Sequence, residues 1–219
     1  MNKLLTSLLM IGVIAGMAGA GTWAYFSDTE TSVSNGFTAG TLGLKLADPN
    51  ETAADGVTQT WSAGPIAPGA APTSAWVDLT NDGNIAANHV EINFAIGNVN
   101  VVTPIEISAI DDADITDSID VTTMTYGTTA VTNLLLQTTT GTFDNAALEA
   151  ADTDNDSIIQ LDELNNVNLN DLVPVPTPSS AQAQRFTMAI QLQAGTGNGN
   201  QGDDATLTLT FTLNQDASQ

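Results

Sequence analysis

The stretch TLTLTFTL, residues 206–213, alternates threonine with a large apolar residue. A period of two places the apolar side chains on one face, which is typical of a half-buried antiparallel strand. The same alternation occurs at 41–47 (TLGLKLA), 75–80 (AWVDLT) and 90–96 (VEINFAI). Shorter strand candidates are 59–62, 105–110, 120–126, 131–137 and 186–193.

Turn signals separate these segments, among them Pro68-Gly69, Asn81-Asp82-Gly83 and Tyr126-Gly127. Eight or nine short strands with almost no helix between them are typical of two packed antiparallel sheets. The sequence therefore predicts an all-β fold, a jelly-roll-like antiparallel β-sandwich over residues 38–219. Threonine is abundant and lysine is scarce on its outward positions, so we expect sheet edges that can pair with another strand.

The composition excludes whole classes of function. The 219 residues include 25 acidic and three basic side chains, for a formal net charge of −22 at pH 7. This charge repels phosphate backbones and anionic lipid headgroups, so we expect no nucleic-acid binding and no membrane association of the mature protein. The chain has no cysteine, which excludes disulfides and thiolate metal sites.

Residues 1–24 have the composition of a signal peptide. Lys3 precedes an almost wholly apolar stretch that ends in small residues at Ala20. Two cleavage points fit, one after Ala20 and one between Ala24 and Tyr25. The alternative is a retained membrane anchor, because ~17 to 25 apolar residues can span a bilayer. We expect cleavage and a secreted, strongly acidic product.

Residues 152–163, DTDNDSIIQLDE, break the strand pattern. D-x-D-x-D with Glu at the twelfth place is the spacing of an EF-hand loop, which wraps oxygen ligands around Ca²⁺. The predicted ligands are the carboxylates of Asp152, Asp154, Asp156 and Glu163, the backbone carbonyl of Ile158, and Gln160 through a bridging water. Ser157 stands where a glycine usually adopts a positive φ, at a cost of ~1 kcal/mol. The alternative is a solvated acidic loop.

Helix-forming residues flank this loop at 144–151 and 161–167, so we expect a short helical, EF-hand-like insertion at about 142–172. Asp144 or Asn145 can cap the first helix. Ile159 falls where the loop needs an apolar anchor.

Other polar features are less specific. The acidic group Asp111, Asp112, Asp114, Asp117 and Asp120 could hold a second cation, but it is more typical of a solvated loop or a short helix start. Asn50 begins an N-glycosylation sequon. A second sequon begins at Asn155 and overlaps the predicted calcium loop.

Catalytic residues are few. His89 is the only histidine, which excludes an H-E-x-x-H zinc helix and any multi-histidine site. It stands at the start of a predicted strand, where we expect a structural surface residue. A hydrolase with a carboxylate pair remains open, but aromatic residues, which would stack sugars, make up only 5% of the chain. We therefore predict that the protein is not an enzyme.

The runs GTWAYFSD (21–28) and FTAGTLGL (37–44) resemble the TasA/camelysin family of secreted proteins, which includes bacterial biofilm-matrix fibre subunits and archaeal bundling pilins. A weaker similarity continues through Pro68-Gly69, VDLTNDG (77–83) and VEI (90–92). The resemblance implies that a dedicated signal peptidase cuts between Ala24 and Tyr25. Camelysin members have also been described as metallopeptidases, for which this sequence offers one histidine and no zinc-binding helix.

The same resemblance implies jelly-roll subunits that polymerise by donor-strand exchange, in which the mature N-terminus of one subunit fills a groove in the next. Here the matching tail is 25–37, and its predicted anchors are Tyr25, Phe26, Val33 and Phe37. An extended tail without proline can add to a sheet edge through backbone hydrogen bonds. The alternative is an ordinary first strand that folds into its own sandwich.

These observations predict a structural subunit of an extracellular filament, a pilus or biofilm-matrix fibre, that assembles as a homopolymer by donor-strand complementation. The alternative is a monomeric, calcium-stabilised binding module or camelysin-like hydrolase of the cell surface.

Overall fold

The computed structural model describes residues 41–48, 52–53, 66–99, 114–175, 183–197, 200 and 203–216. The chain divides into two units, Met1–Ala39 and Gly40–Gln219, and all the described residues belong to the second. The predicted signal peptide and its cleavage site, the tail 25–37, Asn50 and the strand candidates 59–62 and 105–110 lie outside the described residues.

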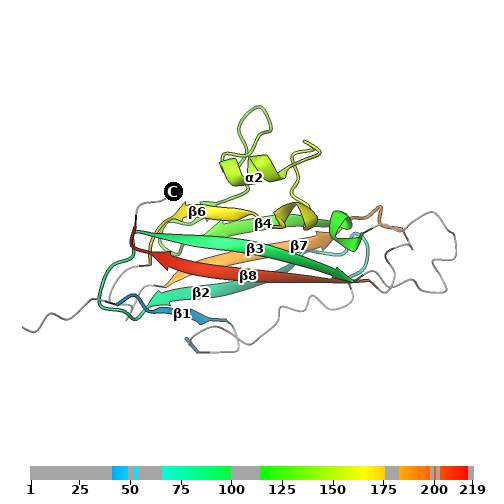
Figure 1. Cartoon of the computed structure of the whole chain (residues 1–219). Coiled ribbons are helices and arrows are strands. Elements are labelled where there is room, and N and C mark those ends of the chain that lie inside the picture. The colour runs from blue at the N-terminus through cyan, green and yellow to red at the C-terminus, as the bar shows by residue number, and fades with distance from the viewer. Residues whose placement is uncertain are drawn as a thin grey trace, which may run out of the picture. The chain divides into compact units, whose positions relative to one another are not determined.

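Two antiparallel sheets form the body of the second unit (Figure 1). The five-stranded sheet has the order β1 (Leu44–Ala47), β2 (Thr73–Asn81), β7 (Gln184–Leu192), β4 (Ile119–Tyr126) and β5 (Thr132–Asn133). The three-stranded sheet has the order β6 (Asn168–Leu172), β3 (His89–Val99) and β8 (Asp204–Asn214). All the pairings between these strands are antiparallel. The predicted all-β sandwich is confirmed.

The inner faces of the sheets pack through one cluster of buried apolar side chains. Val90, Ile92 and Phe94 of β3 are fully buried at 0% exposure, as the alternation in this segment predicts. Phe94 meets Phe186 of β7 edge to face, with ring centroids 6.2 Å apart. Burial of this apolar surface is the main favourable contribution to folding.

Most predicted strands are present, with shifted ends. The segments 75–80, 90–96, 120–126, 186–193 and 206–213 correspond to β2, β3, β4, β7 and β8. The segment 131–137 is a strand only at Thr132–Asn133. The chain turns there, because the side chain of Asn133 accepts a hydrogen bond from the backbone N–H of Leu135 (3.1 Å). The rest of that prediction is wrong.

The predicted strand 41–47 begins only at Leu44, because the residues before it are held by the β2–β3 turn. Asn81 is fully buried, and its Oδ1 accepts from the N–H groups of Gly43 (3.2 Å) and Gly83 (3.0 Å). Its Nδ2 donates to the carbonyl of Ile85 (3.0 Å). A Cβ on Gly83 would lie 2.1 Å from the carbonyl oxygen of Thr41, so only glycine allows this close approach.

The connection between the sheets contains the short helical elements. Helix α2 (Ala146–Ala151) is capped by Asn145, whose side chain accepts from the N–H groups of Ala147 and Leu148. Of the two predicted caps, Asn145 is therefore confirmed. The helix predicted at 161–167 is wrong, because only the single turn η2 (Asp162–Leu164) forms. A second single turn, η1 (Ile115–Ser118), precedes β4.

Strand β6 lies at the end of the predicted insertion and was not expected from the sequence. Its sequence NLNDL contains asparagine and aspartate, which are depleted in strands. Pairing with β3 nevertheless brings Leu169 and Leu172 into the core. Among the described residues, none of the helices is long and apolar enough to cross a membrane.

Candidate metal centre and open sheet edge

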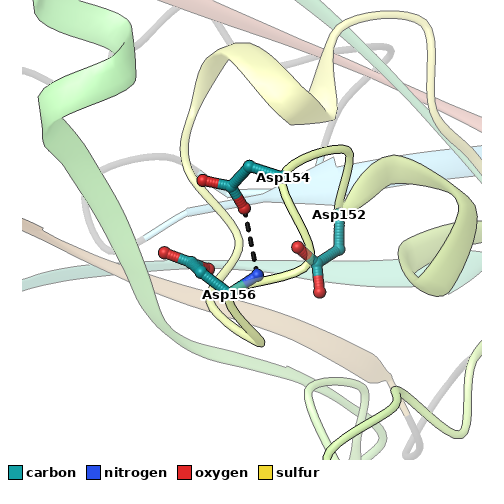
Figure 2. A group of neighbouring side chains, drawn as sticks. All are labelled: Asp152, Asp154 and Asp156. Carbon is teal, nitrogen blue, oxygen red and sulfur yellow. Dashed lines mark hydrogen bonds between the residues drawn. The ribbon is translucent and has the colours of Figure 1, made fainter.

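The predicted calcium loop joins α2 to η2 and brings three aspartates together (Figure 2). One carboxylate oxygen each of Asp152, Asp154 and Asp156 lies within 4.8 Å of the other two. No other group of three or more such ligating side chains occurs in the described part of the chain. Of the four carboxylates that the spacing places around one point, these three lie together, and their ligation of a metal stays a prediction.

Backbone hydrogen bonds curl the loop around the carboxylates. The N–H of Asp156 donates to Oδ1 of Asp154 (3.1 Å), as Figure 2 shows, and the N–H of Ile158 donates to Oδ1 of Asp156 (2.7 Å). The N–H of Ser157 donates to Oδ2 of Asp152 (3.2 Å). Ser157 has a φ of 67°, the left-handed conformation expected at this position, and Asn155 has a φ of 59°.

Two buried side chains in the loop each carry an oxygen that lacks a partner. Asp152 is 7% exposed and Gln160 is 8% exposed. Among the described residues, nothing donates a hydrogen bond to Oδ1 of Asp152 or to Oε1 of Gln160. Leaving such a buried group unpaired costs ~1 to 3 kcal/mol. A cation within the loop would provide the missing partner, which distinguishes this loop from an ordinary acidic surface.

The remaining predicted ligands surround the triad in different ways. Nε2 of Gln160 donates to Oδ2 of Asp156 (3.1 Å). Glu163 is outside the triad: its Oε1 accepts from the N–H of Thr153 (2.7 Å) and its Oε2 from the N–H of Gln160 (3.1 Å). The side chain of Ile158 is 42% exposed. Metal ligation by Glu163, Gln160 and the Ile158 carbonyl stays a prediction.

The second half of the loop is fixed to the sandwich. Ile159 and Leu161 are 1% and 3% exposed, so the predicted apolar anchor at Ile159 is confirmed. The N–H of Val121 in β4 donates to the carbonyl of Ile159 (2.8 Å), and the N–H of Leu161 donates to the carbonyl of Ile119 (2.9 Å). No local sequence pattern predicts this pairing, because it joins segments about 40 residues apart.

The loop carries more negative charge than its ligands alone. Partial burial raises the pKa of the Asp162 carboxyl above its ordinary value, and the charges of Asp117 and Glu163 raise it further. A positive ion nearby would relieve this repulsion. An all-oxygen donor set of this kind suits hard divalent cations.

The other acidic stretch is used for structure where it is described. Oδ1 of Asp114 accepts from the N–H of Thr116 (2.9 Å) and caps η1. Oδ1 of Asp120 accepts from Nε2 of Gln193 (2.7 Å). Asp111 and Asp112 lie outside the described residues. Asn155, the second sequon, is exposed, and its glycosylation stays a prediction.

His89 is buried at 4% exposure, so the expectation of a surface residue is wrong. Its Nε2 lies 3.2 Å from Oε1 of Glu91 and 3.2 Å from Nδ2 of Asn214. Pairing of β3 with β8 places His89 opposite Asn214 and encloses the imidazole. The imidazole lies at the end of the three-stranded sheet, and its Nδ1 has no hydrogen-bond partner among the described residues.

A second feature is the edge strand β8. Its inward side chains face those of β3 in register, with Phe94 opposite Leu209 and Ile92 opposite Phe211. The β3 residues are fully buried, whereas the inward side chains of β8 remain partly exposed: Ala205, Leu207, Leu209, Phe211 and Leu213. The core is therefore incompletely covered along β8.

The partly covered side of the sandwich lies between β8 and β1. The hydroxyl of Tyr126 in β4 donates to the carbonyl of Val173 just after β6 (3.0 Å), so β6 lies on the β4 side and β8 on the opposite side, toward β2 and β1 (Figure 1). Leu44 and Leu46 of β1 are likewise only partly buried. No described strand pairs with the outer edge of β8.

A family model for camelysin metallo-endopeptidases matches residues 2–219 of the chain. The search of curated proteins found no match to this chain.

Proposed function

The chain belongs to the TasA/camelysin family, and we propose that it is the subunit of an extracellular filament that grows by strand addition at β8. The observation that carries the proposal is the partly exposed inner face of β8, at an edge with no described strand beside it. A long, uncharged edge strand is a template for pairing with another chain. Residues 205–213 contain no charged side chain.

We propose that the tail 25–37 of a second copy supplies the missing strand. Thirteen extended residues span about 43 Å, and the eleven residues of β8 span about 36 Å, so the tail is long enough to follow the whole edge. Backbone hydrogen bonds would run along the added strand, and Tyr25, Val33 and Phe37, which fall on one face of an extended strand, would cover the exposed inner face. This arrangement would complete the core only in the assembled filament.

We further propose that the protein is not a peptidase. A catalytic zinc ion takes three protein ligands, commonly histidines, and keeps one position open. The sequence has one histidine, and His89 is buried against Glu91 and Asn214. The described carboxylate triad is an oxygen set that suits a hard cation. The residues present therefore do not fit the catalytic metal that the family description implies.

For the loop 152–163 we propose Ca²⁺ as the ligand. Carboxylates at loop positions one, three and five, together with the buried unpartnered oxygens of Asp152 and Gln160, match the donors that Ca²⁺ takes in EF-hand loops. Affinity is expected in the extracellular range, ~10⁻⁴ to 10⁻³ M. The ion would hold the insertion closed.

Electron microscopy of the secreted protein tests assembly. Leu209→Asp places a charge on the inner face of β8, where the added strand would enclose it at a cost of several kcal/mol. Thr210→Asp places the same charge on the exposed outer face of the same strand. We expect filaments from the wild type and from Thr210→Asp, and folded monomers from Leu209→Asp. Normal filaments from Leu209→Asp would overturn the proposed edge.

Val33→Asp tests the donor side in the same way, and it should abolish assembly while the subunit still folds. Circular dichroism on each variant separates failed assembly from failed folding. Soluble monomers from the wild type, with or without residues 25–37, would instead favour the monomeric calcium-stabilised binding module.

A further inference from the structure

The side of the five-stranded sheet opposite β1 is covered in two parts. Strand β4 pairs with β7 along one side. On its other side, β5 pairs only with Thr125 and Tyr126, and the N–H of Leu134 adds one bond to the carbonyl of Met124 (2.8 Å). Strand β5 therefore covers only the end of β4.

The loop 152–163, called the metal loop from here on, covers the beginning of β4. Residues 159–161 lie antiparallel to 119–121, with a bridge between Gln160 and Asp120. The two bonds of this bridge join Val121 to Ile159 and Leu161 to Ile119, at 2.8 and 2.9 Å. These bonds use backbone groups of β4 that would otherwise be exposed as an open sheet edge.

Gln160 belongs to both features. Its backbone forms the bridge to β4, while its side chain donates to Asp156 and carries one of the buried unpartnered oxygens. Its N–H is also held by Glu163. A change in the conformation of the loop around the ion would therefore act directly on residues 159–161, which cover β4.

We propose that the metal loop is a calcium-dependent cap on the edge of β4, and that removal of the ion frees this edge to pair with a strand of a second copy. The proposal rests on the calcium site proposed above, but not on filament growth at β8.

Opposing forces set the strength of the cap. Burial of Ile159 and Leu161 holds the loop against the core. Without an ion, the three converging carboxylates of the triad repel one another, which favours opening. The ion removes the repulsion, so it should shift the equilibrium toward the capped form.

The partner that fits the uncapped edge is another strand of the same protein. β4 has the sequence IDVTTMTY, rich in β-branched residues, with one charge. Such a strand with a free edge is typical of edge-to-edge association. A copy of this chain also offers the open edge of β8.

Amide hydrogen exchange on the secreted, full mature chain tests the cap. The N–H groups of Val121 and Leu161 should exchange about tenfold more slowly at a calcium concentration ten times the Kd than in EGTA. The N–H of Gly127, which donates to the carbonyl of Arg185 (2.9 Å) away from the loop, should not change. Glu163→Gln should lose the effect. Asp144→Asn removes one negative charge from an exposed position before α2, and in this variant calcium should still slow the exchange of Val121 and Leu161.

Calorimetric calcium titration of the same samples separates the outcomes. Calcium binding without slower exchange at Val121 and Leu161 would overturn the cap and leave the calcium site standing. No calcium binding would overturn both, while filaments seen by microscopy would still support assembly at β8. Two results together would support the cap. Exchange at Val121 and Leu161 would be slower in calcium, and the wild type would bind thioflavin T, a dye for strand-to-strand association, only in EGTA. Glu163→Gln would bind the dye both in EGTA and in calcium.

Discussion

Glu163→Gln provides the most direct test of the metal loop, because it removes the charge at loop position twelve with almost no change in shape. Calcium stabilises the folded state by RT ln(1 + [Ca²⁺]/Kd). With a Kd of ~10⁻⁴ to 10⁻³ M, 10 mM calcium contributes about 1.4 to 2.7 kcal/mol. In a domain of this size 1 kcal/mol moves the Tm by ~2 to 4 °C, so calcium should raise the wild-type Tm by about 3 to 11 °C.

The variant should lose most of this shift. If its Kd rises to ~10 mM or more, calcium contributes about 0.4 kcal/mol or less, and the Tm moves by roughly 1 °C. The Tm without calcium will change as well. Glu163 accepts from the N–H groups of Thr153 and Gln160, and a glutamine has one acceptor oxygen for the two donors. The calcium-induced shift is therefore the quantity to compare.

Differential scanning calorimetry at fixed ionic strength, with sodium replacing calcium in the blank, measures this shift. Asp144→Asn is the matched control, because it removes one exposed negative charge beside the loop and should keep the full shift. Equal shifts in the wild type and in Glu163→Gln would refute the assignment of Glu163 as a ligand. The absence of a shift in the wild type would mean that the loop is only acidic surface.

Other parts of the fold make independent predictions. Asn81→Ala should destabilise the protein by about 2 to 4 kcal/mol in urea unfolding, because it leaves three backbone groups without partners, and a loss below about 1 kcal/mol would contradict this role. Asp162→Asn should raise the Tm in EGTA at pH 7, because the raised pKa of Asp162 means that ionisation disfavours the folded state. This gain should vanish below about pH 3, where the carboxyl is protonated in both states, and a gain that persists there would contradict the stated cause. Phe94→Ala should cost about 3 to 5 kcal/mol, whereas Phe211→Ala should cost clearly less in the monomer, because its ring is only partly buried; equal costs would contradict incomplete covering of β8.

The fold was predictable where the period of two is long. In β3 and β8 every second residue is apolar over most of the strand, and the strands form as the pattern predicts. The prediction failed where tertiary contacts override local preference. The segment 168–172 becomes a strand only because β3 pairs with it, and 161–167 is not a helix because Asn166 adopts a φ of 65° after a single turn.

The carboxylate triad was predictable because Asp152, Asp154 and Asp156 lie within five consecutive residues, so their spacing alone brings them together. What the sequence could not give is the environment of those ligands. The buried, unpartnered oxygens belong to Asp152, which ends α2, and to Gln160, which bridges to Asp120 of β4. His89 was misplaced for the same reason, since its burial depends on Asn214 at the far end of the chain.

The β8 edge and the β4 side of the sandwich differ in charge, and this difference bears on which of them a second subunit can approach. The loop beside β4 carries five acidic side chains between residues 152 and 163, whereas residues 205–213 of β8 carry none. In a chain with a net charge of −22, two copies repel most strongly where acidic groups face each other. Approach at β8 therefore meets less repulsion than approach at the loop, which covers backbone groups of β4 and places its negative charge beside them. In the cap proposed above, a calcium ion would lower the charge of the loop but hold the loop more firmly on β4. The ion would therefore protect β4 only if the firmer cover outweighs the weaker repulsion.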